Sequence, residues 1–258
     1  MSPKIIYYYQ TFVGLNDILY KECPVTHIHL SSIHFGKNDN GESYIHLNNN
    51  EPTDKLFDDV WKDLEEASNM GIKIVLMIGG AGGAYSELFN NFSVYYPLLC
   101  DLLNKKNIIS GVDLDIEEGV ELENVKMLIN NIKTDYNNYT ISMAPVQYAL
   151  QTNEPGMGGF IYKDLLESSV GKHIDYFNGQ FYSSYTCDSY MECIKNGYSR
   201  DMIVMGMCGS DYIEDDCEEL KKIVSSGNIG GVFIWEYNLR SENWEKNISN
   251  IINNNYKF

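Results

Sequence analysis

The sequence predicts an α/β fold of the (β/α)8 barrel type, in which eight parallel strands form a ring surrounded by helices. Eight short apolar runs recur along the chain, and segments of helical periodicity separate them, as in parallel sheets covered by helices. The chain has 258 residues, a typical length for one such barrel. The fourth run ends in closely spaced carboxylates, at the edge where these barrels place their functional residues.

The eight runs are predicted strands because apolar, β-branched and aromatic residues dominate them. They are Lys4–Tyr9, His27–Phe35, Lys73–Ile78, Gly111–Glu117, Thr140–Pro145, Tyr176–Tyr182, Met202–Met207 and Gly231–Tyr237. After the second run, Asn40-Gly41 is the signature of a tight hairpin turn. We therefore expect Ser32–Leu47 to project from the second strand as a hairpin.

Helices are predicted where apolar residues recur at spacings of three and four. The clearest segments are Thr53–Asn69, Tyr95–Asn104, Glu121–Tyr136, Asp215–Ser225 and Asn243–Asn254. Gly71 and Gly227 follow two of these segments as stop signals. Pro97 is expected in the first turn of its helix, because a proline farther along would remove a backbone hydrogen bond.

The net charge of −17 at pH 7 argues against binding to nucleic acid or to an anionic membrane surface. No apolar run approaches the length of a membrane span. The first residues lead directly into the first predicted strand, without the long apolar segment of a secretory signal. The expected location is therefore the cytoplasm or release by another route, or the extracellular space if a leader was removed.

The six cysteines form no Cys-x-x-Cys pair, so neither a zinc site nor a redox dithiol is expected. Cys187 and Cys193 are close enough in the sequence to form a disulfide, and the sequence leaves their state open. We expect no metal and no cofactor. A monomer with one domain over residues 1–258 is predicted.

Asp113, Asp115 and Glu117 alternate with apolar residues in the fourth predicted strand. Alternate side chains of a strand point to the same face, so these three carboxylates are expected on one face. Each like charge raises the pKa of its neighbours, so such a row is rare unless it binds a cation or keeps one carboxyl group protonated. In a barrel, Glu117 would lie at the mouth, where the strands end.

The sequence around these carboxylates resembles the signature of glycoside hydrolase family 18, which is Asp-Gly-x-Asp-x-Asp-x-Glu. Glu118-Gly119, which follows, makes it most similar to the plant class III chitinase (hevamine-like) branch. Three further segments resemble strand-end motifs of the family: Lys73–Gly80, Gln180–Tyr182 and Gly230–Trp235. The resemblance extends over nearly the whole chain, so residues 1–258 are expected to form one catalytic barrel.

The resemblance implies a chitinase-like endo-hydrolase of β-1,4-linked N-acetylglucosamine polymers that uses a substrate-assisted, retaining mechanism. Glu117 would protonate the leaving glycosidic oxygen and later act as a base on water. Asp115 would accept a hydrogen bond from the acetamido N–H of the substrate, and Asp113 would share a proton with Asp115. Tyr182 would donate its hydroxyl to the acetamido oxygen.

The same resemblance places Trp235 as an apolar floor under the reacting sugar. Gln180, Met143 and Tyr9, at the ends of predicted strands, and Gly80 are expected to line the groove. The expected partner is chitin, a chito-oligosaccharide or another glycan that contains N-acetylglucosamine.

Two positions depart from the family pattern. Ser110 replaces the first Asp of the signature, and Met77 replaces the Ser of a Ser-x-Gly-Gly motif. Both changes are expected to remove polar support behind the carboxylates and to alter the tuning of their pKa values.

Only about twenty residues separate the seventh and eighth predicted strands, too few for the additional α+β insertion of deep-cleft relatives. An open groove and internal cleavage of a polymer are therefore expected.

Other interpretations of these motifs are weaker. Three alternating acids also suit a divalent cation, but Tyr182 and Trp235 in register favour the glycosidase. The glycines of Gly79–Gly83 suggest a phosphate loop, but the Gly-Lys-Ser/Thr ending is missing, and a loop over the groove is favoured. His27 and His29 have the spacing of a metal pair, but two core or hydrogen-bonded histidines are the preferred interpretation.

Two other functions remain open on the same scaffold. An endo-β-N-acetylglucosaminidase would act on the chitobiose core of N-glycans with the same residues. A carbohydrate-binding lectin or inhibitor would lack catalysis. The presence of Glu117 and Tyr182 argues against this last function, whereas Ser110 and Met77 keep it open.

Overall fold

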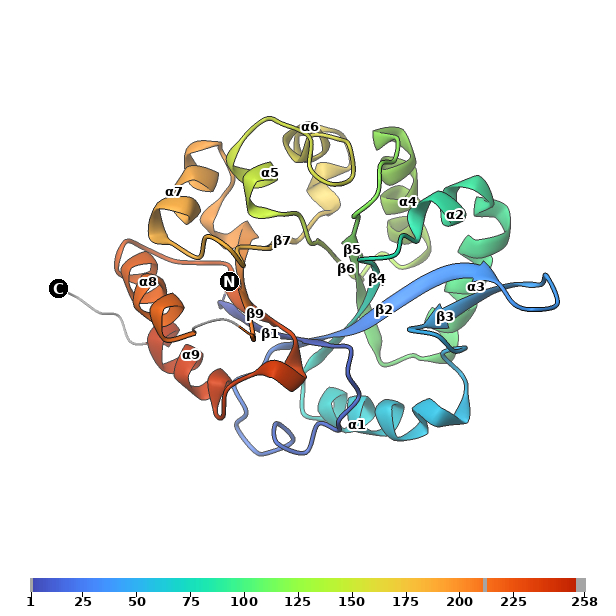
Figure 1. Ribbon diagram of the computed structural model, residues 1–258, viewed down its shortest axis with the longest axis horizontal. Helices are drawn as coiled ribbons and strands as arrows, with labels where there is room; N and C mark the ends of the chain where they lie inside the picture. Colours follow the sequence, from blue (N-terminus) through green and yellow to red (C-terminus); the bar gives the residue numbers. More distant parts are fainter. Residues whose placement is uncertain (1, 211–212, 254–258) are drawn as a thin grey trace.

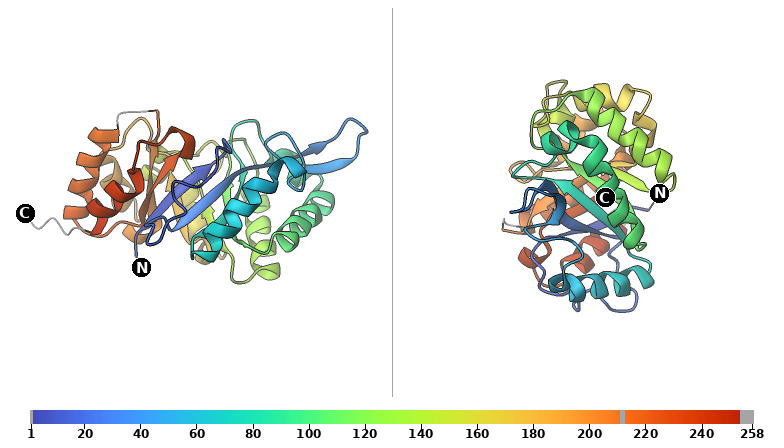
Figure 2. Two further views of the ribbon diagram at one scale, coloured as in Figure 1. Left: turned by 90° about the horizontal axis from the view of Figure 1, so that it is seen from below. Right: turned by 90° about the vertical axis from the view of Figure 1, so that its right-hand side faces the viewer.

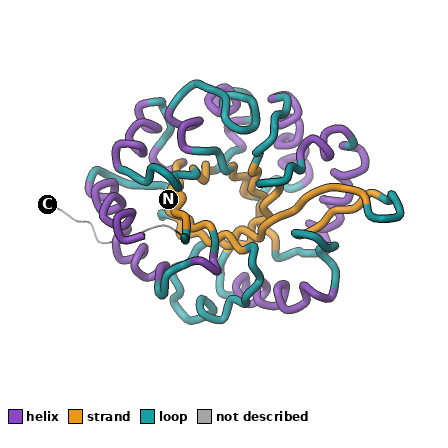
Figure 3. Tube along the Cα trace, in the orientation of Figure 1, coloured by secondary structure: helices purple, strands orange, loops and turns teal. Residues whose placement is uncertain are grey.

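A closed ring of parallel strands forms the centre of the computed structural model, which describes residues 2–210 and 213–253 (Figures 1 and 3). Its strands are β1 (Lys4–Tyr9), β2 (His27–Lys37), β4 (Lys73–Gly79), β5 (Ile109–Asp115), β6 (Thr140–Met143), β7 (Tyr176–Gly179), β8 (Ile203–Cys208) and β9 (Gly231–Trp235). Each pairs in parallel with the next, and β1 pairs with both β2 and β9, which closes the ring. The predicted (β/α)8 barrel is confirmed as a single domain.

Strand β3 (Ser43–Leu47) pairs antiparallel with the far end of β2, and the hairpin projects beyond the ring (Figure 2). The predicted hairpin is therefore confirmed, but its turn differs. Lys37 pairs with Ser43, so five residues form the connection in place of a tight two-residue turn. The side chain of Asn38 accepts hydrogen bonds from the backbone N–H groups of Asn40 and Glu42, which organises this longer loop.

Helices surround the ring on its outer side (Figure 1). They are α1 (Asp58–Asn69), α2 (Tyr85–Asn90), α3 (Phe92–Lys105), α4 (Leu122–Asp135), α5 (Gln147–Gln151), α6 (Tyr162–Glu167), α7 (Cys187–Lys195), α8 (Ile213–Ser225) and α9 (Trp244–Asn253). Short 3-10 turns lie at η1 (Lys55–Phe57), η2 (Gly171–His173), η3 (Arg200–Met202) and η4 (Tyr237–Leu239). All five predicted helices are present, although Asn254, at the end of the last, lies outside the described residues.

The prediction for Pro97 was wrong. Helix α3 begins at Phe92, so Pro97 lies in its second turn. The upstream extension is stabilised by packing, because the Phe92 ring stacks on Tyr96 with centroids 4.9 Å apart. Tertiary contacts therefore compensate for the donor that proline lacks.

Strand alternation divides the core into two layers. The larger layer lies between the strands and the helices. The barrel interior holds a smaller cluster, which consists of Ile6, Tyr8, Met77, Tyr176, Val204 and Phe233, with Tyr182 and Trp235 packed against it.

The segment between β8 and β9 contains α8, and its described residues form no additional α+β module. All six cysteines are free thiols, so Cys187 and Cys193 are not bridged. No helix in the described ranges has the length and apolar character to span a bilayer.

Candidate active site

The three carboxylates lie on β5, the fourth strand of the barrel, and just beyond it. The strand begins at Ile109 and ends at Asp115, two residues earlier at each end than predicted. Asp113 and Asp115 therefore point into the barrel, with 0% and 5% of their surfaces exposed. Glu117 follows the strand and is half-buried at the mouth.

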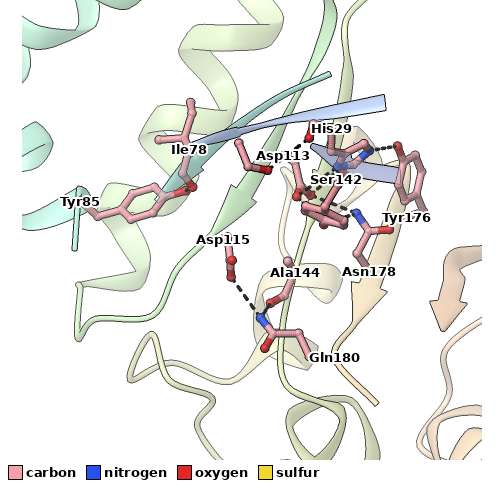
Figure 4. A network of polar contacts seen from close by, with 12 residues as sticks. His29, Ile78, Tyr85, Asp113, Asp115, Ser142, Ala144, Tyr176, Asn178 and Gln180 are labelled. Atoms are coloured by element: carbon pink, nitrogen blue, oxygen red, sulfur yellow. Dashed lines mark hydrogen bonds and ion pairs between the residues drawn. The ribbon is translucent and has the colours of Figure 1, made fainter. Parts of the chain in front are cut away.

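Asp113 is the centre of a buried hydrogen-bond network (Figure 4). The hydroxyls of Tyr8 and Ser142 each donate to its carboxylate at 2.6 Å, and the Asn178 amide donates at 3.2 Å. His29 Nδ1 lies 3.2 Å from Asp113 Oδ2, at ion-pair distance but without a hydrogen bond. Asn178 Nδ2 also donates to the Tyr8 oxygen at 2.9 Å, so the Tyr8 proton is directed toward Asp113.

This surrounding shell determines the charge of Asp113. Burial alone would raise the pKa of the carboxyl group, but the nearby His29 and the donors from Ser142 and Tyr8 outweigh it. The pKa of Asp113 is therefore held below its ordinary value. Because donors surround it, Asp113 is an anion in the barrel interior.

The environment of Asp115 has the opposite effect. Burial raises the pKa of Asp115 well above its ordinary value, and the negative charges of Glu117 and Asp113 raise it further. Two buried carboxylates next to each other cannot both ionise readily. The pair Asp113 and Asp115 thus holds one proton and one negative charge, with the proton on Asp115.

Gln180 connects the carboxylates at the mouth. It follows β7 and pairs with Val146 as an isolated bridge. Its amide Nε2 lies 3.3 Å from both Asp115 Oδ1 and Glu117 Oε1, and it donates to the Ala144 carbonyl at 2.9 Å. The amide therefore holds both acids on one side of the mouth, facing the same space.

Tyr182 and Trp235 are half-buried at the upper end of the interior cluster. The Tyr182 ring meets Phe233 edge to face with centroids 6.1 Å apart, and the Trp235 ring lies 5.5 Å from that of Tyr8. Burial, followed by the nearby Asp115 carboxyl group, raises the pKa of Tyr182 well above its ordinary value. Its hydroxyl therefore remains a hydrogen-bond donor over the working pH range.

Gly80 brings the loop after β4 against the carboxylates. Its backbone N–H donates to the Asp115 carbonyl at 2.9 Å. Its φ of +82° lies in the left-handed region, and a Cβ atom there would meet Met77 Cε at 2.9 Å and Asp115 Oδ2 at 3.4 Å. Glycine at this position leaves the space beside Asp115 open.

The structure places Tyr9 and Met143 away from this space. Both side chains have 0% exposure and belong to the layer between the strands and the helices. Tyr9 packs on Phe12 and Tyr237, and its hydroxyl accepts a hydrogen bond from the Gly14 N–H. Their odd positions on β1 and β6 direct them outward, whereas Tyr8 and Ser142 point inward.

The two departures from the family pattern lie in different environments. Ser110 does not support the carboxylates from behind as expected: it lies at the register shift between β4 and β5, where the pair Ile74–Ile109 is followed by Val75–Gly111. Its hydroxyl donates to the Ile74 carbonyl at 3.1 Å. Met77 does face the interior and pairs with Asp113 across β4 and β5. Only the second departure changes the surroundings of the carboxylates.

Glu118, adjacent to Glu117, anchors the β5 loop to the start of α2. Its carboxylate accepts from the N–H groups of Ala84 and Tyr85 at 2.5 Å and from the Ser86 hydroxyl at 2.5 Å. Burial raises the pKa of Glu118, but these donors lower it by more, so the pKa lies below its ordinary value. A carboxylate already occupies the backbone donors that a phosphate would need after Gly83, so the loop interpretation of Gly79–Gly83 is favoured.

The preferred interpretation of the two histidines is confirmed. His27 and His29 are buried in the barrel, where His27 Nδ1 contacts Thr26 Oγ1 at 2.8 Å and His29 Nε2 contacts the Tyr176 hydroxyl at 3.2 Å. The described residues contain no group of three or more His, Cys, Asp or Glu with the arrangement of a metal site.

Sequence reasoning did not assign the partners of Asp113, which are Tyr8, His29, Ser142 and Asn178. The alternation of side chains along each strand could have identified them. Each is separated by an even number of residues from another residue of its strand that faces the barrel interior. A depression of about 1040 Å³ between α8 and α9, lined by Gly209 and Leu239 among others, lacks Asp113, Asp115 and Glu117. The chemistry therefore identifies the barrel mouth as the site.

Comparisons with known proteins agree with this geometry. A family model described as "Glycosyl hydrolases family 18" matches residues 4–207. Similar solved structures include a fungal endo-β-N-acetylglucosaminidase (26% identity, TM-score 0.86, 97% of this chain and 98% of that chain). They also include the chitinase ChiC from Aspergillus fumigatus (27% identity, TM-score 0.84, 91% of each chain). A chitinase-like agglutinin from Robinia pseudoacacia shares the fold (14% identity, TM-score 0.66, 96% and 99%). No curated protein sequence matches the chain. The family match covers well over half of the sequence, and the chain belongs to glycosyl hydrolase family 18.

Proposed function

We propose that this protein is a chitinase-like glycoside hydrolase that cleaves β-1,4 bonds within polymers of N-acetylglucosamine, with residues 1–258 as one catalytic barrel. The observation that supports this most directly is the Gln180 amide, 3.3 Å from a carboxylate oxygen of both Asp115 and Glu117. It aligns a buried, protonated acid with a half-exposed one on the same side of the mouth. We also propose that the chain is related to the plant class III branch, on the basis of the Gln180–Tyr182 and Trp235 motifs.

The proposed reaction begins at Glu117. Its carboxylic acid donates a proton to the glycosidic oxygen while the bond from that oxygen to the anomeric carbon breaks. The acetamido oxygen of the same sugar attacks the anomeric carbon, and a cyclic oxazolinium ion forms. Water then attacks the anomeric carbon and transfers a proton to the Glu117 carboxylate, while the bond from that carbon to the acetamido oxygen breaks and the acetamido group is restored. Two displacements at the anomeric carbon leave the product with the original anomeric configuration.

The pair Asp113 and Asp115 stabilises this cation. Asp115 accepts a hydrogen bond from the acetamido N–H, and the single negative charge of the pair offsets the positive charge of the oxazolinium ring. The shared proton moves toward Asp113 as that charge develops. Tyr182 donates its hydroxyl to the acetamido oxygen before ring closure and holds it in line with the anomeric carbon.

Trp235, Gln180 and Gly80 form the proposed sugar-contacting surface. Trp235 supplies an apolar face for the sugar ring, Gln180 supplies an amide, and Gly80 leaves room beside Asp115. Tyr9 and Met143 are not part of this proposal, because their side chains are fully buried in the outer layer.

An endo-β-N-acetylglucosaminidase acting on N-glycan cores is a second candidate. The observation that favours it is the likeness to the fungal enzyme of that name, at 26% identity and a TM-score of 0.86. The two candidates require the same acid and the same acetamido group. They differ in the sugars beyond the cleaved bond.

The deciding experiment compares both substrates from pH 4 to pH 9. A fluorogenic chitotrioside and a high-mannose glycopeptide are incubated with the wild type, with Glu117→Gln and with Glu121→Gln. Glu121 is an exposed carboxylate four residues downstream and serves as the matched control. We expect chitotrioside cleavage by the wild type and the control, and none by Glu117→Gln, which should still bind chito-oligosaccharide in calorimetry. Cleavage of the glycopeptide alone would select the second candidate, and binding without cleavage of either would indicate a lectin.

A further inference from the structure

His29 is a buried charge partner that the proposed reaction does not use. Its side chain and that of Asp113 both have 0% exposure, and its Nδ1 lies 3.2 Å from Asp113 Oδ2. Its other ring nitrogen lies 3.2 Å from the Tyr176 hydroxyl (Figure 4). The imidazole is thus held between the carboxylate and a phenol at the centre of the barrel.

Asp113 has four polar partners among the described residues, and His29 is the one that can carry a positive charge. The others are two hydroxyls and an amide, from Tyr8, Ser142 and Asn178. On the neighbouring strand β4, the residue paired with Asp113 is the apolar Met77. Among these four partners, the only group that can balance the negative charge of Asp113 with a positive one is therefore His29, on β2.

The groups that face His29 from the packed strands are Tyr8 on β1, His27 on β2, Asp113 on β5 and Tyr176 on β7. Burial, followed by the charges of His29, Lys73 and Lys4, lowers the pKa of His27 to about 2. His27 therefore stays neutral. His29 is the imidazole that lies beside the Asp113 carboxylate.

We propose that His29 is a positioning residue whose imidazolium supplies the counter-charge for the Asp113 and Asp115 pair. With this charge in place, the pair keeps one proton and one negative charge. The inference rests on the proposed function, in which that negative charge offsets the oxazolinium ion.

The counter-charge has a definite consequence for pH dependence. A positive charge nearby lowers the pKa of carboxyl groups, so it keeps a second proton off the pair until the pH is low. Without it, the pair takes up two protons at higher pH and can no longer offset the oxazolinium charge. The acid limb of the rate profile then moves to higher pH.

The test compares His29→Gln with His27→Gln. His27 lies two residues away on the same face of β2 and is also buried, but it does not contact Asp113. Both variants and the wild type are assayed on the chitotrioside from pH 4 to pH 9. We expect His29→Gln to move the acid limb of kcat up by about half a pH unit or more, which lowers kcat about 3-fold or more on that limb and little above it, with KM nearly unchanged. His27→Gln should keep the wild-type profile. An equal loss at every pH, or the same shift in His27→Gln, would overturn the proposal.

A second measurement separates this inference from the proposed function. Nitrogen-15 NMR of the imidazole rings in the whole wild-type protein reports the charge of each of the five histidines directly. The His29 resonance is assigned from its loss in His29→Gln, or by elimination with variants of the other four. We expect a charged ring at pH 6 that becomes neutral in Asp113→Asn. A neutral ring in the wild type would overturn the inference whether or not the protein cleaves any glycan. A charged ring in a protein that cleaves neither substrate would refute the proposed function alone.

Discussion

Replacement of Ser142 by Ala should weaken the fold in a pH-dependent way. Ser142 has 0% exposure, and its hydroxyl donates to Asp113 at 2.6 Å. A hydrogen bond to a charged group contributes about 1.5 to 3 kcal/mol to the free energy of unfolding. We therefore expect Ser142→Ala to lower this free energy by about 2 kcal/mol at pH 7. In a chain of this size that corresponds to a Tm about 4 to 8 °C lower.

The pH dependence follows from the direction of the Asp113 shift. The pKa of Asp113 is lowered in the folded protein, so its ionised form stabilises the fold above the ordinary Asp pKa of about 3.9. That contribution is lost as the pH falls through the folded-state pKa. The deficit of Ser142→Ala should therefore be full at pH 5 to 7 and shrink only as the pH falls through the lowered folded-state pKa of Asp113, since a protonated Asp113 loses the charged part of the interaction.

Denaturant unfolding at pH 7, 5 and 3, followed by circular dichroism, measures this difference. Ser189→Ala is the matched control, because Ser189 is buried in α7 and shares a 2.6 Å hydrogen bond with the uncharged Ser184 hydroxyl. Its deficit should be about 1 kcal/mol and constant over this pH range. A Ser142→Ala deficit below about 0.5 kcal/mol at pH 7, or one that grows as the pH falls, would refute the charge assignment of Asp113.

Four further outcomes are expected. Tyr182→Phe should lower kcat by about 10- to 1000-fold, since one transition-state hydrogen bond is lost; an unchanged rate would mean that its hydroxyl does not reach the acetamido group. Asp115→Asn should abolish turnover yet raise the free energy of unfolding at pH 8 by about 1 to 2 kcal/mol, because a buried acid with a raised pKa opposes folding above its ordinary pKa; denaturant titration checks the sign. Glu118→Gln should lower Tm and move the midpoint of acid unfolding to higher pH, because the ionised Glu118 carboxylate, whose pKa is lowered in the fold, stabilises the native state and glutamine cannot replace its charge. An acid-unfolding midpoint at the wild-type pH would contradict the role of Glu118 as an anchor. Turnover should survive dialysis against a strong chelator; loss that added metal restores would support a cation site.

The barrel was predictable because its signals are local and repeated. Each strand is an apolar run long enough to recognise, and most predicted strands begin within two residues of the observed ones. The four helices that were not predicted, α2, α5, α6 and α7, have 6, 5, 6 and 9 residues. So few turns leave little room for a 3.6-residue period to emerge.

The site was predictable where one short motif contains it. Asp113, Asp115 and Glu117 follow from alternation alone, and the resemblance supplies Gln180, Tyr182 and Trp235. The contacts of Asp113 were not predictable in the same way, because they come from β1, β2, β6 and β7 and meet only when the ring closes. Which of two neighbouring acids is charged depends on those contacts and not on the order of the residues.

The carboxylates also differ in how deeply they are embedded, and this has an evolutionary consequence. Asp113 is connected to four strands, so a change there disturbs the whole barrel. Glu117 is half-exposed and meets Gln180 at 3.3 Å, beyond the end of its strand. The group proposed to perform the chemistry is therefore the one that the fold can most easily lose. A single substitution at Glu117 would leave an intact sugar-binding barrel, so inactive descendants of such an enzyme are within one mutational step.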